Sequence, residues 1–185
     1  MQIAVYSGSF NPLHIGHLAI LRRLVARFDG VYLVVSPQNP FKDASSNETG
    51  ESRLQAAREA VARHPELGGK VQVDDIELGM EPPHYTIRTL RALRDREPDN
   101  SFTLIIGADN LVRFSLWREH DIILKEFGIA VFPRKGFHRG HLKAALMKED
   151  PAYQIELIDA PLVTVSSTEI REARAAGRSV SHLLM

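Results

Sequence analysis

Short apolar runs rich in β-branched residues alternate along the chain with segments of helical periodicity. Strands are predicted at residues 3–6, 31–35, 71–73, 102–106, 129–132 and 155–158. Apolar side chains recur at helical spacing between them, for example at Leu18, Leu21 and Val25 and again at Leu54, Ala57 and Val61. Such alternation is typical of βαβ units, so we expect an α/β domain with a mainly parallel sheet flanked by helices.

Two polar segments follow predicted strands. In open parallel sheets, ligands bind beyond the carboxyl ends of the strands, near a switch in strand order. The segment 37–50 follows the second strand and contains prolines, asparagines, serines and a glycine, so it should border the ligand crevice as a loop. Its length suggests the hypothesis of a lid. Residues 134–140 form a second expected turn region.

Composition limits the classes of function. The chain has 185 residues, 44% hydrophobic and 25% charged, which suits one globular domain over residues 1–185. Lys plus Arg and Asp plus Glu both number 23, so no global field indicates a nucleic acid or a membrane as partner. Cysteine is absent, which excludes disulfides, thiolate metal sites and a cysteine nucleophile. No signal peptide and no membrane-spanning run is recognisable, so we expect a cytoplasmic protein.

The first candidate site is residues 8–17, GSFNPLHIGH, between the first strand and the first helix. Gly8 permits a sharp turn and close approach to a ligand, and backbone N–H groups at a helix N-terminus favour an anion. His14 and His17 are three apart, so they can point the same way, and Gly16 leaves room between them. Imidazoles donate N–H groups and can carry positive charge near neutral pH, which suits phosphate. A structural pair of histidines, or two ligands of a metal, are the alternatives.

The second candidate site is residues 165–171, VSSTEIR. Ser166 and Glu169 have the spacing of a capping box, which predicts a helix start. Ser167 and Thr168 would then lie in the first turn with spare hydroxyls. Arg171 adds a guanidinium suited to phosphate. The alternative is an ordinary capped helix with a solvated arginine.

Together the two motifs resemble the nucleotidyltransferase superfamily that shares the (H/T)xGH signature with class I aminoacyl-tRNA synthetases. From residue 3 to about residue 171 the chain is similar to bacterial nicotinate-nucleotide adenylyltransferases, with a Rossmann-like fold. The similar segments are residues 8–17, 37–42, 83–90, 106–111 with Trp117, and 165–171. Ser9, Asn11 and Phe41 depart from the commoner Thr, Asp and His.

The resemblance implies adenylyl transfer from ATP to nicotinate mononucleotide, giving deamido-NAD and pyrophosphate, with Mg²⁺ carried by ATP. It implies a set of ATP contacts: Gly8, Ser9, Phe10, His14, His17, Gly107, Asp109, Ser167, Thr168 and Arg171. The implied catalytic residues are His14, His17 and Arg171 from that set, together with Lys42. The implied contacts of the mononucleotide are Tyr85, Thr86, Trp117 and Arg134. No protein metal ligand and no nucleic acid partner is implied.

Alternatives stay open for the substrate and for several side chains. A nicotinamide-mononucleotide or phosphopantetheine adenylyltransferase, or a cytidylyltransferase, would share the motifs. A nucleotide-sensing module without turnover would also keep the pocket. Trp117 could belong to the core, Asp109 could cap a helix, and Tyr85 with Thr86 could simply start one.

Overall fold

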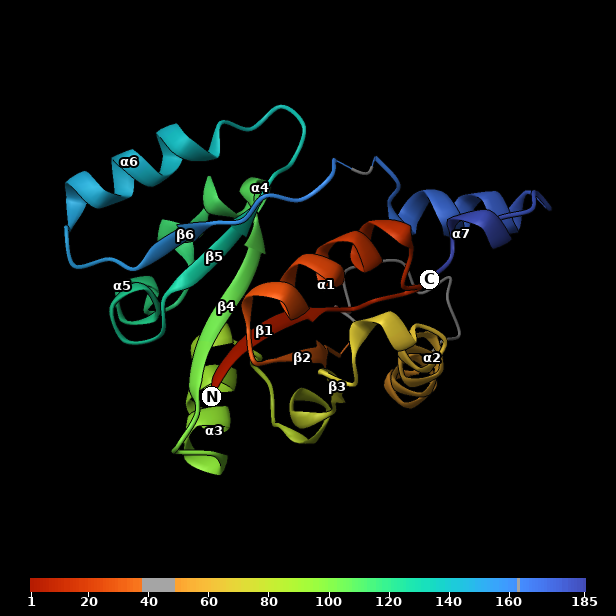
Figure 1. Cartoon of the computed structure of the whole chain (residues 1–185), viewed down its shortest axis with the longest axis horizontal. Coiled ribbons are helices and arrows are strands. Elements are labelled where there is room, and N and C mark those ends of the chain that lie inside the picture. Colours follow the sequence, from red (N-terminus) through yellow and green to blue (C-terminus); the bar gives the residue numbers. More distant parts are fainter. Residues whose placement is uncertain (38–48, 163) are drawn as a thin grey trace.

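Six parallel strands form one sheet in the order β3-β2-β1-β4-β5-β6. The computed structural model describes residues 1–37, 49–162 and 164–185. All six predicted strands are confirmed, and with them the Rossmann-like α/β class (Figure 1). Their bounds are β1 Gln2–Gly8, β2 Gly30–Val35, β3 Val71–Asp74, β4 Ser101–Gly107, β5 Ile129–Phe132 and β6 Ile155–Leu157.

Helices connect the strands. Their bounds are α1 Ile15–Arg27, α2 Gly50–Ala62, α3 Thr86–Arg96, α4 Ala108–Leu111, α5 His120–Ile122, α6 Arg139–Glu149 and α7 Ser167–Ala175. A π-helical turn, Ile123–Phe127, follows α5 directly. The expected turn region at residues 134–140 is too long, because α6 already begins at Arg139. Leu146 is the one described residue of α6 that is buried, so this helix lacks the broad buried stripe of α1, α2 and α3.

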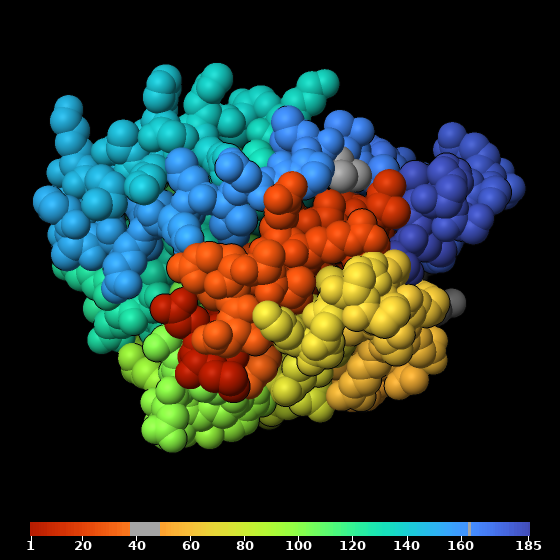
Figure 2. Space-filling view, in the orientation of Figure 1, coloured from red at the N-terminus to blue at the C-terminus, as the bar shows by residue number. Residues whose placement is uncertain are grey.

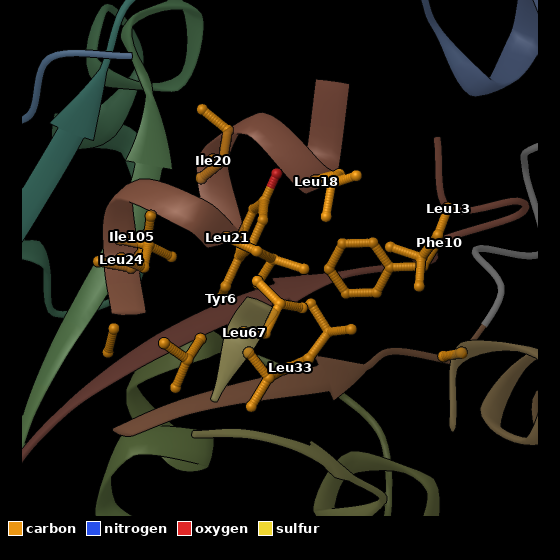
Figure 3. Packing of buried hydrophobic residues seen from close by; sticks show 14 of the residues in the cluster. Tyr6, Phe10, Leu13, Leu18, Ile20, Leu21, Leu24, Leu33, Leu67 and Ile105 are labelled. Carbon is orange, nitrogen blue, oxygen red and sulfur yellow. The ribbon is translucent and has the colours of Figure 1, made fainter. Parts of the chain in front are cut away.

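The sheet is buried on both faces, as expected for parallel strands covered by helices. Alternate residues of one strand enter opposite cores: Ala4 and Tyr6 pack under α1 and α2, whereas Ile3 and Val5 face α3 and the segments after β4. Figure 3 shows the first of these cores, with Leu18, Leu21 and Leu24 of α1 lying against side chains from the strands. Successive residues of a strand thus enter one core and then the other, and both are buried, which explains why the inner strands read as continuous apolar runs in the sequence.

The strand order reverses beside β1. Its neighbours are β2, the next strand in the sequence, and β4, which comes only after β2 and β3. A crevice at such a switch point is where ligands bind in this fold. The carboxyl ends of β1, β4 and β5 are Gly8, Gly107 and Phe132, so the predicted motifs at residues 8–17 and 106–111 meet at one edge of the sheet.

Among the described residues, no helix has the length and apolarity needed to cross a membrane.

Candidate active site

His14 and His17 lie together at the N-terminus of α1. His14 is the N-cap, and its Nδ1 accepts from Gly16 N–H at 3.0 Å, while His17 Nδ1 accepts from His14 N–H at 3.1 Å. The two rings are stacked, with centroids 3.8 Å apart. Because both Nδ1 atoms accept, each neutral imidazole must carry its proton on Nε2. The helix start therefore fixes two Nε2–H donors side by side, which confirms that the pair points one way.

The electrostatic environment keeps both rings neutral at pH 7. Burial, followed by the charge of Arg134, lowers the pKa of His14 to about 4. Burial, then His14 and Arg134, lowers the pKa of His17 well below its usual value. The expectation that these rings carry positive charge near neutral pH is therefore wrong for the protein without ligand. They offer neutral N–H donors, and the fixed positive charge at the site comes from arginine.

This shift in pKa predicts a loss of stability on mild acidification. The pKa of His14 is about 4 in the folded chain against 6.5 ordinarily, so the unfolded chain binds more protons. The stabilisation is fully present above the ordinary pKa and is lost as pH falls from there toward the folded value. Between pH 7 and pH 5, His14 alone should cost about 2 kcal/mol of unfolding free energy. The control is His14→Asn, which keeps an acceptor for Gly16 N–H but has no ring to protonate. In urea unfolding, the free energy of unfolding of this variant should fall between pH 7 and pH 5 by about 2 kcal/mol less than that of the unsubstituted chain. Equal decreases would contradict protonation of His14 as the cause.

The turn after β1 packs against the ring of His17. Phe10 has a φ of 48° and its ring packs edge-on against Tyr6 and His17, with centroids 5.4 and 5.2 Å away. A Cβ on Gly8 would lie 3.2 Å from the Phe10 ring, so the close approach favours glycine there. The Phe10 side chain is buried in the core, so any contact it makes with ATP would have to come from its main chain.

Asp109 and Arg134 face each other across the ends of β4 and β5. Arg134 Nε is 3.6 Å from Asp109 Oδ1, and both side chains are 44% exposed. The N-cap of α4 is Gly107, not Asp109, so the capping alternative for Asp109 is wrong. A Cβ on Gly107 would come within 2.5 Å of Asp109 Oδ1, so the glycine makes room for this carboxylate. An ion pair as exposed as this one contributes little to stability.

Two adjoining pockets connect the histidine pair, the Asp109–Arg134 pair and the second motif. Both pockets include Pro133 and Arg134 in their walls. One is completed by Tyr6, His14, Gly16, His17, Ile20, Phe132 and Pro161. The other is completed by Asp109, Lys135, Phe137, Leu162, Thr164, Val165 and Ser166. Arg134 thus stands between the histidine pair and the second motif, and the structure brings both sequence motifs to one crevice.

The second motif begins a helix, as predicted, but its side chains are already engaged. Ser166 Oγ accepts from Glu169 N–H at 3.1 Å as the N-cap of α7. Ser167 Oγ donates to Pro12 O at 2.9 Å. Arg171 donates to Asn11 O at 2.6 Å and to Thr168 Oγ1 at 3.2 Å. The expectation of a spare hydroxyl is wrong for Ser167, and the alternative of a solvated Arg171 is also wrong, because both side chains bind the turn before α1. The Thr168 hydroxyl only accepts a bond from Arg171.

Tyr85, Thr86 and Trp117 form a second group of the predicted residues. Thr86 is the first residue of α3 and Tyr85 is its N-cap, so they do start a helix. The Arg118 guanidinium lies 5.3 Å from the Tyr85 ring centroid, which brings the α3 start beside the Trp117 segment. Trp117 is half-buried against Phe114, with ring centroids 4.8 Å apart, so it is partly a core residue with one side accessible.

Lys42 and Phe41 lie outside the described residues, as does most of the expected loop at 37–50. Sequence reasoning overlooked Arg53 on α2. Its side chain is 2% exposed, and Nη1 donates to Ser9 O at 2.8 Å and to Ser36 O at 2.7 Å. It therefore ties the turn after β1 to the end of β2. Arginines are seldom this buried, so nothing in the sequence distinguishes Arg53 from its solvated neighbours.

Within the described ranges, no three His, Asp or Glu side chains gather in a way that could hold a metal ion. The crevice is instead furnished with N–H donors and arginine, a donor set that matches phosphate oxygens.

Comparison with known proteins gives first the class. The model of the cytidylyltransferase-like family matches residues 5–173, nearly the whole chain. The nicotinic acid mononucleotide adenylyltransferase of Plasmodium falciparum, solved with APC, superposes with a TM-score of 0.76 over 99% of this chain and 90% of its own, at 18% identity. Its structure with NaAD gives 0.73 over 92% and 82%, at 19% identity. Fold and family model define a nucleotidyltransferase of Rossmann-like architecture.

Sequence relatives narrow the class. A probable nicotinate-nucleotide adenylyltransferase of Bacteroides fragilis is 38% identical over 99% of this chain and 87% of its own length. A second, of Flavobacterium johnsoniae, is 36% identical over 100% of this chain and 92% of its length. The chain belongs to the nicotinate-nucleotide adenylyltransferase family.

Proposed function

We propose that this protein transfers the adenylyl group of ATP to nicotinate mononucleotide, giving deamido-NAD and pyrophosphate in the synthesis of NAD. Relatives that carry the name of this activity align over the full chain. The structural observation that carries the proposal is the pair of Nε2–H donors that His14 and His17 present at the switch point of the sheet. Such a pair suits a triphosphate whose charge shifts during the reaction.

The chemistry needs no protein nucleophile. A phosphate oxygen of the mononucleotide attacks the α-phosphorus of ATP in line, and the bond from that phosphorus to the bridging oxygen of the β-phosphate breaks. The electron pair leaves with pyrophosphate. The protein contributes orientation and charge stabilisation, as in phosphoryl transfer generally. His14 and His17 supply preorganised donors to the phosphate oxygens, and their neutral state leaves the site ready to receive the polyanion.

Further residues are assigned by position. Arg134 stands beside both histidines and would compensate phosphate charge, while Asp109 would turn from Arg134 to a ribose hydroxyl. The N–H groups at the α7 start, at Ser167 and Thr168, would hold the triphosphate together with Lys42. Arg171 would add its positive charge while it keeps its bond to Asn11 O. Gly8, Ser9 and Gly107 would offer main-chain contacts. Mg²⁺ would be carried by the triphosphate, since it prefers phosphate oxygens and water to an all-protein cage.

The start of α3 is the proposed site of the pyridine. The N-terminus of a helix favours a negative charge, so a nicotinate carboxylate fits there better than an amide. Trp117, half-buried and adjoining this helix start through Arg118, would stack on the pyridine ring. This arrangement supports the acid as substrate over nicotinamide mononucleotide. Phosphopantetheine has no aromatic ring, so it could not stack on Trp117.

Trp117→Ala should chiefly raise the KM for nicotinate mononucleotide, by about tenfold, with kcat changed much less. Stacking is present both before and during reaction, so its removal weakens binding uniformly. Steady-state kinetics at saturating ATP measure the split. Leu116→Ala, one residue away and 81% exposed, is the control and should leave KM unchanged. An unchanged KM for Trp117→Ala would assign that side chain to the core alone.

ATP labelled at the α-phosphorus tests the reaction class. The label should appear in the dinucleotide product, and the released pyrophosphate should be unlabelled and equal in amount. Label in a protein adduct, or transfer of the terminal phosphate, would contradict direct adenylyl transfer. A nucleotide-sensing module would bind ATP and give neither product.

Location and partners follow from the same features. A chain without cysteine suits a reducing compartment, and its zero formal charge offers no footprint for nucleic acid, so we place the enzyme in the cytoplasm with ATP and the mononucleotide as its partners.

A further inference from the structure

Three successive carbonyl groups before α1 accept hydrogen bonds from the C-terminal part of the chain. Asn11 O accepts from Arg171 Nη1 at 2.6 Å, and Pro12 O accepts from Ser167 Oγ at 2.9 Å. Leu13 O accepts from Met185 N–H at 3.4 Å. The segment that leads into His14 is therefore held along its length by residues more than 150 positions away in the sequence.

The last of these bonds belongs to a larger contact. His14 and Leu184 form an isolated antiparallel β-bridge, so residues 184–185 lie beside the histidine turn. The Met185 side chain is 4% exposed and packs in the core beneath α1 and α2. Arg63, the C-cap of α2, donates to Met185 O at 2.9 Å. Figure 2 shows the dark blue C-terminal atoms lying against the orange atoms at the start of α1.

These contacts converge on a residue whose backbone geometry sets the site. His14 is the N-cap of α1, in an extended conformation with φ −139° and ψ 178°. Its Nδ1 reaches Gly16 N–H and its N–H reaches His17 Nδ1, so a rotation of the His14 backbone would disturb both imidazoles together. Displacement of about 1 Å in a reacting group is enough to cost about 10²-fold in rate.

We propose that residues 184–185, locked by the Met185 side chain and by Arg63, are a positioning element for the catalytic histidines. The element contacts neither reacting phosphate; it acts through Leu13 and His14, holding both Nε2–H donors at the orientation that adenylyl transfer needs. This inference rests on the proposed function for its effect on rate, but the geometry it concerns is measurable without turnover.

The experiment uses the full chain with Met185→Asp, which disfavours burial of the side chain, and Met185→Leu, which retains it. Long-range ¹H–¹⁵N correlation spectra of the imidazoles at pH 7 report which ring nitrogen of His14 and His17 carries the proton. The expected spectra show the Nε2–H form fixed in the unsubstituted chain and in Met185→Leu, and averaging between the two tautomers in Met185→Asp. Correspondingly, kcat should fall at least about tenfold in Met185→Asp, with the KM for ATP changed less than about threefold.

Two further variants separate positioning from general loss of stability. Ile155→Ala removes a buried side chain at the amino end of β6, the opposite edge of the sheet, and should lower the melting temperature without changing the imidazole spectra or kcat. Arg63→Ala removes only the donor to Met185 O and should give a smaller change in the same direction as Met185→Asp. If folded Met185→Asp and Arg63→Ala keep the native imidazole spectra, the positioning element is disproved, whatever the enzyme turns over. If the unsubstituted chain shows no adenylyl transfer but the imidazole spectra of Met185→Asp still change, the positioning element stands and the proposed function is contradicted.

Discussion

Replacing His17 with alanine is expected to lower kcat for pyrophosphate release by about 10²-fold or more. The His17 Nε2–H is a donor fixed before the reaction, because His14 N–H occupies Nδ1. Preorganised donors are worth most where charge develops in the transition state, so the loss should appear in kcat more than in the KM for ATP. Initial rates at saturating ATP and nicotinate mononucleotide measure the effect.

His141→Ala is the matched control for this substitution. His141 lies on the exposed side of α6 and its ring contacts His138 rather than the crevice. Its removal should leave kcat unchanged. A folded His17→Ala variant with a near-normal rate would remove His17 from the catalytic group.

Replacing Arg53 with methionine is expected to lower the free energy of unfolding by about 2–4 kcal/mol, because two carbonyl groups lose their bonds to a buried, charged donor. Those acceptors are Ser9 O and Ser36 O, directly after the neighbouring strands β1 and β2. Methionine keeps most of the volume, so the effect reports chiefly the polar contacts of the guanidinium. For a chain of this size the melting temperature should drop by roughly 5–15 °C.

Arg58→Met on the same helix is the control, because Arg58 is exposed. It should change the melting temperature by no more than about 2 °C. Urea unfolding of both variants gives the comparison. Equal stabilities for Arg53→Met and Arg58→Met would show that the bonds from Arg53 contribute nothing beyond solvation.

The inner strands were predictable because they are buried on both faces and therefore read as apolar runs; β2, for example, is buried throughout. The edge strands β3 and β6 are less buried and gave shorter or weaker signals. Helices α1 and α2 were predictable from their apolar stripes. The helix α6 was missed for the converse reason: it lies on the surface and buries little. Local hydrophobic patterning thus specifies the elements that enter the two cores and says least about those that do not.

In the site, the local features were predictable and the long-range ones were not. The facing of His14 and His17 and the cap at Ser166 depend on neighbours three residues away, which the sequence displays. The charge of His14 and His17 depends on their burial and on Arg134, which lies 120 and 117 positions further along the chain. The sequence alone therefore suggested the wrong protonation. The binding of Ser167 and Arg171 to the turn at Asn11 and Pro12 is likewise a product of the tertiary fold.

Pyrophosphate release from ATP and Mg²⁺ should be measured with nicotinate mononucleotide, nicotinamide mononucleotide and phosphopantetheine side by side. A carboxylate that accepts from the α3 N-terminus makes a charge-assisted bond that an amide lacks, so kcat/KM should be about 10–100-fold higher with the acid than with the amide. Phosphopantetheine should give no release above background. Faster release with either of the other two substrates, or silence with all three while ATP still binds, would contradict the assignment of this protein as a nicotinate-nucleotide adenylyltransferase.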